Sequence, residues 1–197
     1  MIRLHCTKKL LAKLPLREGG RLKNKRPSHY PANEGDESPL SGWHANLILL
    51  QRRQCVLLVH DATRFPVFIP ALKKADFAEL DYWFADGFMN ALLKTGADDV
   101  LMDCAHAALG PLVCDTECDR SVQGTMNRMA QDIEHMLWYE DASVMDLARA
   151  GHEEITACRR EHVGCGEVRT APFWDVARNR LATVRFLRHH TLHRMER

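Results

Sequence analysis

The stretch from residue 41 to residue 70, SGWHANLILLQRRQCVLLVHDATRFPVFIP, constrains the fold of this chain more than any other. Its two aliphatic runs, residues 47–50 and 55–59, are too short for globular helices and are typical of buried strands. The polar sequence QRRQ separates them. We therefore predict an antiparallel hairpin whose turn is centred between Arg52 and Arg53, although two arginines are poor residues for a tight turn.

This register predicts a polar pair at one end of the hairpin. His44 would lie opposite Asp61, with an imidazole beside a carboxylate. A one-residue slip would instead move every side chain to the other face and place His60 opposite Ala45. After the turn that follows Asp61, residues 64–69 are predicted to form a third strand, closed by a proline.

Length and composition favour one domain with an extension. The chain has 197 residues and a net charge of +1, so it can bury one substantial core and has no bulk attraction to polyanions. No apolar run approaches the roughly 20 residues that cross a bilayer, and the start lacks a signal peptide. The odd number of cysteines, seven, fits reduced thiols. We expect a cytoplasmic protein with a domain at residues 1–150 and a basic, partly helical extension at residues 151–197.

Hydrophobic periodicity predicts the other elements. Residues 16–40 are rich in Gly, Pro, Asn, Ser and charge, and are predicted to be a long surface loop. The fold class is α+β, with an antiparallel sheet of about four strands, a meander at its centre, and three to four helices packed on it. Further predicted elements are strands at 2–6 and 112–114 and helices at 7–14 (capped by Thr7), 76–94 (ended by Gly96) and 98–109, followed by one that is capped by Ser121 and runs to about residue 139. A spacing of three and four predicts two buried helix faces: Phe77, Leu80, Phe84, Phe88 and Ala91 in the helix at 76–94, and Val122, Met126, Met129, Ile133 and Met136 in the long helix.

Five separated segments carry a resemblance to a known family. They are CTKKLL, SGWHANL, QRRQCVLLVHDATRFPVFIP, the helix with LDYWF and GFMNALLK, and DRSVQGTMN. Over about residues 1–140 the chain resembles an uncharacterised family of small bacterial proteins catalogued as a domain of unknown function. The resemblance implies an association with plasmids and other mobile elements, and no particular activity. The chain departs from the family in having Asp119 where Asn is common, and in the segment after about residue 150.

Three groups of basic and polar residues are candidate phosphate-binding sites. Helix starts attract anions, and cations beside them would add to this attraction. The alternative is that these are ordinary solvated residues. The candidates are Lys8 and Lys9 at the first helix, Arg120, Ser121 and Asn127 at the long helix, and Arg185 and Arg188 in a basic C-terminal helix. They favour an accessory protein that binds RNA or DNA, or an acidic protein partner, with an affinity that falls with salt.

The alternative function is an enzyme. His44 would be a general base oriented by Asp61, and Arg64 with Arg120 would stabilise negative charge during metal-independent cleavage of a phosphodiester, as in a ribonuclease. Ser121 or Asn127 would position the substrate. The structural alternative for His44 and Asp61 is a cross-strand polar pair. The enzyme needs these residues around one cleft, whereas the binding protein needs a continuous positive face.

No cofactor is predicted. His152, Cys158, His162 and Cys165 have the chemistry of zinc ligands, but their spacing is irregular and lacks a CxxC motif, which favours ordinary thiols. Cys6, Cys55 and Cys114 fall in predicted strands and are expected to be buried and inert. Cys118, near Arg120, is the one cysteine whose pKa could be lowered.

Overall fold

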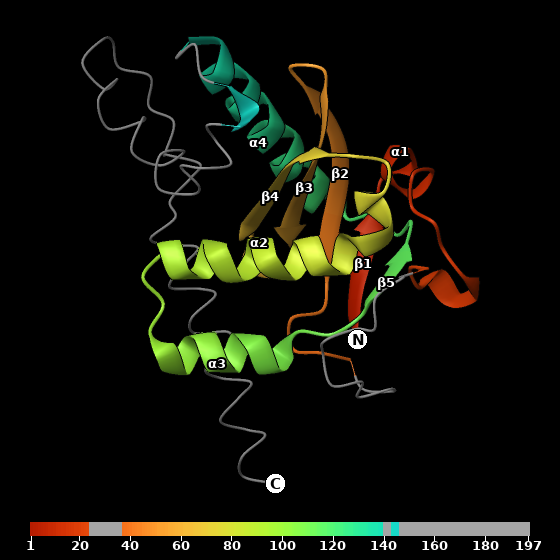
Figure 1. The fold of residues 1–197 in the computed structure, drawn as a ribbon, viewed down its shortest axis with the longest axis vertical. Coiled ribbons are helices and arrows are strands. Elements are labelled where there is room, and N and C mark those ends of the chain that lie inside the picture. The colour runs from red at the N-terminus through yellow and green to blue at the C-terminus, as the bar shows by residue number, and fades with distance from the viewer. Residues whose placement is uncertain (24–36, 140–142, 146–197) are drawn as a thin grey trace, which may run out of the picture.

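One sheet of five strands organises the part of the chain that the structure describes, residues 1–23, 37–139 and 143–145 of a computed structural model (Figure 1). The strands are β1 (Ile2–Cys6), β2 (Trp43–Leu50), β3 (Arg53–His60), β4 (Pro66–Leu72) and β5 (Leu112–Asp115). The helices are α1 (Lys8–Leu11), α2 (Leu80–Lys94), α3 (Asp99–Ala108) and α4 (Arg120–Tyr139), with short 3-10 turns η1 (Glu18–Gly20) and η2 (Asp76–Glu79).

The sheet is mixed, with the strand order β4-β3-β2-β1-β5. β2, β3 and β4 form the predicted antiparallel meander, and β1 lies parallel to both β2 and β5. The α+β class is confirmed, but the prediction of a purely antiparallel sheet of about four strands is wrong. The apolar pattern of each strand can be recognised in the sequence. The strands that pair with β1 are far from it in sequence, however, so no local pattern indicates that the pairing is parallel.

The hairpin register differs from the predicted one by two residues. Leu50 pairs with Arg53 and His44 pairs with Val59. The turn is therefore Gln51-Arg52, whose φ angles of 46° and 63° are those of a primed turn, the type that suits the twist of a hairpin. Because a shift of two residues keeps side chains on the same face, His44 and Asp61 still lie on one side of the sheet.

β4 does not end where the sequence predicts. It runs from Pro66 through Pro70 to Leu72, and Ala71 has a φ of 53° beside an irregularity in the pairing with β3. β4 is the edge strand, so a proline there removes no hydrogen bond from a neighbour on its outer side. The expected stop at Pro70 is therefore wrong because the strand is at an edge.

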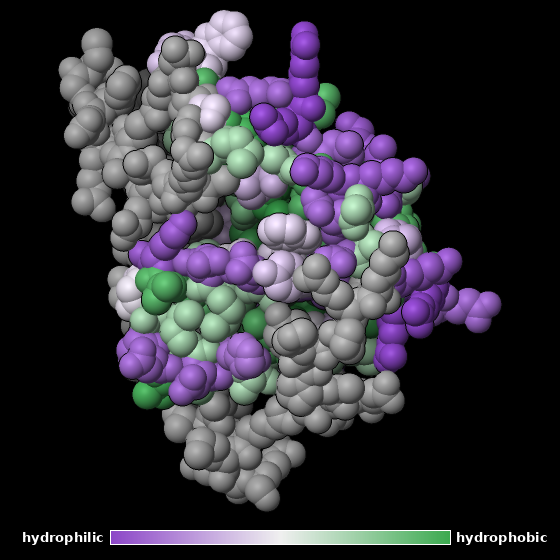
Figure 2. Space-filling model, in the orientation of Figure 1, coloured by the Kyte–Doolittle hydropathy of each residue, from purple (hydrophilic) through white to green (hydrophobic). Residues whose placement is uncertain are grey.

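α2 and α3 cover one face of the sheet. Figure 1 shows α2 crossing the strands with α3 beside it, and Figure 2 shows hydrophilic residues along the outward side of α2 and hydrophobic ones between the two helices. Trp43 packs edge-on against Phe84 and Phe88, with ring centroids 5.0 and 5.7 Å away. The predicted apolar side of α2 is confirmed, because its members are all buried: Phe77, Leu80, Phe84, Phe88 and Ala91.

α4 covers the opposite face and packs against β2 and β3. Its buried residues meet a second, smaller core that includes Leu57 and Val59 of β3. The predicted seam is confirmed except at its end, where Leu137 is buried and Met136 is only partly so. The α4 residues in this core are Val122, Met126, Met129, Ile133 and Leu137.

Two shorter predictions need correction. The helix expected at residues 7–14 is only the single turn α1, and the Thr7 side chain makes no capping hydrogen bond to it. The Thr7 hydroxyl instead donates to Asn46 Oδ1 at 3.0 Å. The first part of the predicted loop at residues 16–40 is structured: a bridge joins Leu16 to Leu22, and Arg21 pairs with Val113 beside β5. The Gly20 backbone approaches the Cys114 carbonyl so closely that a Cβ would overlap it.

Several predictions lie outside the described residues. They concern the extension at 151–197, its basic helix with Arg185 and Arg188, and the zinc candidates from His152 to Cys165. Within the described ranges, the helices are all too short or too polar to cross a membrane.

Candidate functional site

Polar side chains gather on the α4 side of the sheet, at the end where β1, β3 and β5 finish and β2 begins. Strand alternation sends Ile2, Leu4 and Cys6 into the core under α2, and therefore turns His5 to the other face. The parallel register places His5 directly between His44 of β2 and Asp115 of β5. This end of the sheet thus brings two imidazoles and a carboxylate side by side.

His44 and Asp61 are in contact, as the sequence predicts. The Nδ1 of His44 lies 2.6 Å from Oδ1 of Asp61, and its Nε2 accepts a hydrogen bond of 2.8 Å from the backbone N–H of Asp119. Because Nε2 is an acceptor, the neutral ring carries its proton on Nδ1 and donates it to Asp61. Both ring nitrogens are therefore occupied, and the side chain is only 5% exposed.

A glycine makes room for Asp61. Gly42 has a φ of +91°, and a Cβ there would lie 3.2 Å from Asp61 Oδ2. Its carbonyl also accepts a 2.9 Å hydrogen bond from the Asp61 N–H. Gly42 is thus required both by its left-handed backbone and by the close approach of the carboxylate.

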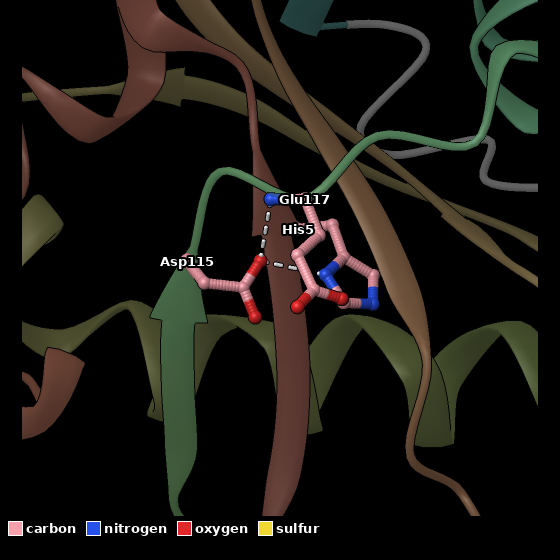
Figure 3. Close-up of side chains that lie close together, drawn as sticks. All are labelled: His5, Asp115 and Glu117. Atoms are coloured by element: carbon pink, nitrogen blue, oxygen red, sulfur yellow. Dashed lines mark hydrogen bonds and ion pairs between the residues drawn. The ribbon is translucent and has the colours of Figure 1, made fainter.

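His5 lies between two carboxylates. Its Nδ1 is 2.6 Å from Asp115 Oδ1, and its Nε2 is 3.7 Å from Asp61 Oδ2. The Glu117 backbone N–H donates to the same Asp115 oxygen at 2.9 Å, which fixes the turn after β5. Figure 3 shows the Asp115 and Glu117 carboxylates beside the His5 ring. The carboxylates are partly open to solvent, whereas His5 is 10% exposed.

Arg64 completes the cluster from the turn after β3. It has a left-handed backbone, with φ of 59°, and its Nη1 donates to the carbonyl oxygen of Asp61. Its Nη2 donates to Ser121 Oγ at 3.2 Å, which links this turn to the start of α4. The structure therefore brings together four residues that the enzyme hypothesis named: His44, Asp61, Arg64 and Ser121.

Asp119, and not Ser121, caps α4. Its Oδ1 accepts hydrogen bonds from the N–H groups of Ser121, at 2.7 Å, and Val122, at 3.3 Å, and these bonds hold the pKa of the carboxyl below its usual value. The prediction of Ser121 as the cap is therefore wrong, because the helix begins earlier, at Arg120, and Asp119 holds its first free amides. An external anion at this helix start would have to displace Asp119.

The described part of this region is acidic. Four carboxylates gather here, those of Asp61, Asp115, Glu117 and Asp119, whereas among the described residues Arg64 is the guanidinium that contacts the cluster, through the carbonyl oxygen of Asp61. An anionic substrate would be repelled here unless a cation compensates for the carboxylates.

The remaining phosphate-binding candidates are exposed residues. Lys8 and Lys9 are exposed on α1, which has only four residues. Arg120 is exposed next to Ser121, and Asn127 is exposed further along α4. The described residues among these candidates have no contact that groups them into one anion site.

Sequence reasoning missed His5, Asp115 and Glu117. Two signals could have found them. Alternation in the strand IRLHC turns His5 away from the apolar residues, and LVCD carries an acid at the matching end of another short strand. What the sequence lacked was the parallel pairing that puts these two ends together.

The predicted burial of three cysteines is confirmed. Cys6, Cys55 and Cys114 are buried. A hydrogen bond with Cys114, together with burial, raises the pKa of Cys6, and burial raises that of Cys55. Cys118 is exposed, and its Sγ donates to Gln123 Oε1 at 3.4 Å.

Comparison with known proteins identifies one family. A family model described as "Domain of unknown function (DUF6933)" matches residues 3–161 of the chain, a range that includes every residue of the cluster. The chain matches no curated protein and no solved structure.

Proposed function

The chain belongs to this family of domains of unknown function, and we propose that it is a hydrolytic enzyme that cleaves phosphodiester bonds, with RNA as the substrate. One observation carries the proposal: Asp61 contacts both histidines with its side chain and Arg64 with its carbonyl oxygen. Acid–base groups and an anion-binding group are thus held in one place, as phosphodiester cleavage requires.

Arg64 is the residue that would hold the phosphate. A guanidinium suits phosphate oxygens, because its planar N–H groups can donate two parallel hydrogen bonds. Its contacts with Asp61 and Ser121 fix its direction, so that little conformational entropy is lost on binding. The Ser121 hydroxyl is exposed beside it and can donate to a second oxygen.

The two histidines have different roles in this proposal. His44 is a positioning residue, because its nitrogens are occupied by Asp61 and by the amide of Asp119. This differs from the expectation that His44 is the general base. His5 is the histidine at the reacting centre, where an imidazole held by carboxylates can carry a proton or bind a metal ion.

The accessory protein that binds nucleic acid without cleaving it remains the second proposal. It would use Lys8, Lys9 and Arg120, which are exposed, and the basic segment with Arg185 and Arg188. The association with mobile elements and a bacterial origin, implied by the resemblance, also stay predictions. No described contact favours this function over cleavage.

Incubation of the full chain with an end-labelled single-stranded RNA tests the proposal. Products are separated on a gel, in buffers with Mg²⁺, with Mn²⁺ or with EDTA. We expect cleavage that Arg64→Ala slows by about 100-fold or more. Arg53→Ala is the matched control, because Arg53 is an exposed arginine at the far end of the hairpin.

Two outcomes would count against the enzyme. Salt-sensitive binding of intact RNA by the wild type would favour the accessory protein. Equal slowing by Arg64→Ala and Arg53→Ala would show that general positive charge is involved and not this cluster. A thermal unfolding curve for each variant excludes loss of the fold as the cause.

A further inference from the structure

The ends of β1 and β5 carry a cluster that neither the sequence nor the family assigns. His5, Asp115 and Glu117 each offer one ligand atom, and these atoms all lie within 4.8 Å of one another (Figure 3). We propose that these three side chains bind a divalent first-row transition metal ion, with Mn²⁺ as the form that supports hydrolysis. One imidazole and two carboxylates are ligands that suit this ion.

The residues behind His5 support this assignment independently. A histidine that binds a metal with one nitrogen usually donates the other N–H to a carboxylate, which fixes the ring. Here Nδ1 faces Asp115, and Nε2 faces Asp61 Oδ2 at 3.7 Å. Asp61 is itself held by His44 at 2.6 Å. The structure thus places a carboxylate behind the His5 ring, on the side where the outer partner of a histidine metal ligand stands.

The backbone holds the ligands in place. His5 and Asp115 are direct neighbours in the register of two parallel strands, and the Glu117 amide donates to the Asp115 side chain. Ligand atoms bound to one ion at about 2.1 Å stand about 3 Å apart. The present 2.6 Å between His5 Nδ1 and Asp115 Oδ1 needs to open by only about 0.4 Å, which side-chain rotation can supply.

Charge favours a cation at this point. The carboxylates of Asp115 and Glu117 lie close together, and Asp61 lies behind His5. Carboxylates brought together repel one another, and a dication between them removes that repulsion. It would also convert an acidic region into one that accepts a phosphate beside Arg64.

The role of the ion rests on the proposed function, whereas its binding does not. Three protein ligands leave coordination positions for water and for a substrate oxygen. A bound ion there would polarise the phosphate and lower the pKa of its water. The cleavage would then be metal-dependent, in contrast to the metal-independent reaction expected from the sequence.

A Mn²⁺ titration of the full chain, after treatment with EDTA, tests the site. Free Mn²⁺ is measured by electron paramagnetic resonance. We expect one bound ion per chain, and affinity at least about 100-fold lower in Asp115→Asn and Glu117→Gln. Glu134→Gln, at an exposed acid on α4, is the matched control and should bind as the wild type does.

A second readout identifies the imidazole. Electron spin echo modulation from a coordinated nitrogen should be present in the wild type and absent in His5→Gln. Asp61→Asn should retain this signal while the affinity falls by about 10–100-fold, because Asp61 acts through His5.

The outcomes separate this proposal from the proposed function. No Mn²⁺ binding by the wild type, or equal binding by the Glu117→Gln and Glu134→Gln variants, overturns the metal site. RNA cleavage that persists in EDTA would then leave the enzyme intact without its metal. Conversely, Mn²⁺ binding with the nitrogen signal but without cleavage supports the site and removes the hydrolytic function.

Discussion

The two faces of the sheet use the same strands for different purposes. Under α2 the inward side chains are apolar, from Leu4 on β1 to Val67 on β4, except for the buried His60, and an aromatic cluster around Trp43 fills the space. Under α4 the core is confined to β2, β3 and β4, and the neighbouring ends of β1 and β5 carry His5 and Asp115. One face is packed throughout, and the other is packed only in part.

The position of α4 explains the difference. The helix begins at Arg120, so that its cap, and not its apolar side, lies beside His44 at the start of β2. Polar groups there can be satisfied by the cap and by one another. The candidate site therefore exists because the apolar side of α4 packs on β2, β3 and β4 and not on the ends of β1 and β5.

The largest expected effect comes from a substitution that removes packing from the α2 face. Phe88 is fully buried against Trp43 and Phe65, so Phe88→Ala should lower the free energy of unfolding by about 3–5 kcal/mol. His5→Ala, on the other face, should cost about 1 kcal/mol or less. Urea unfolding of both variants measures this. Equal losses would show that His5 is a structural residue and that the two faces do not differ in this way.

A second test uses pH. Burial lowers the pKa of His60 from 6.5 to about 4, although the charge of Asp61 raises it in part. As pH falls, His60 takes up a proton in the unfolded chain before it does so in the folded protein. The contribution of the neutral His60 to the free energy of unfolding is therefore fully present above pH 6.5 and is lost as pH falls through 4. The loss should reach about 3 kcal/mol below that pH.

Urea unfolding at pH 7, 5 and 4 would measure this loss. The variant His60→Asn keeps a partner for the Thr63 hydroxyl, which is 2.9 Å from His60 Nδ1, and should lose less stability than the wild type over the same range. Identical pH dependence in both proteins would place the acid sensitivity elsewhere, in the carboxylates of the α4 face.

A smaller effect is expected at the start of α4. Asp119→Ala removes the acceptor for the Ser121 and Val122 amides and should lower the melting temperature by a few degrees. Asp119→Asn keeps that acceptor and should melt close to the wild type. Thermal unfolding of the two variants compares them. If the alanine variant is as stable as the asparagine variant, the cap does not hold this end of the helix.

The smallest expected effect on stability comes from a substitution at Gly124, which tests whether α4 is free of contacts there. A Cβ there would meet nothing within 4 Å, so Gly124→Ala should raise the free energy of unfolding by up to about 1 kcal/mol. Gly20→Ala is the contrasting control and should be destabilising, because its Cβ would overlap the Cys114 carbonyl. RNA cleavage that falls in Gly124→Ala would indicate a ligand at that backbone and would extend the site along α4.

The sequence predicted the fold well where the signal is local. The apolar side of α2 and the alternation in Ile2–Cys6 identify a helix and a strand within a few residues. Gly96, with φ of 75°, follows α2 as expected. The turn at Gln51-Arg52 was missed because neither residue is typical of a left-handed backbone, and the parallel pairing of β1 has no local signal.

The sequence predicts only half of the candidate site. His44 and Asp61 come from adjacent strands of a hairpin, so alternation alone brings them to one face even with the register shifted. His5 and Asp115 meet through a sheet order that the sequence does not reveal. Asp119 was read only as a departure from the family, although aspartate and asparagine serve equally as caps.

The central place of β1 has a consequence for the way the protein is made. His5 and Asp115 are 110 residues apart, and β5 is needed to complete the sheet on that side. At roughly 5–20 residues per second, a ribosome needs on the order of ten seconds to add the second after the first. During that time one edge of β1 has no strand beside it and can pair with another chain. The sheet order therefore implies that the open edge of β1 must be protected from other chains until β5 has been synthesised.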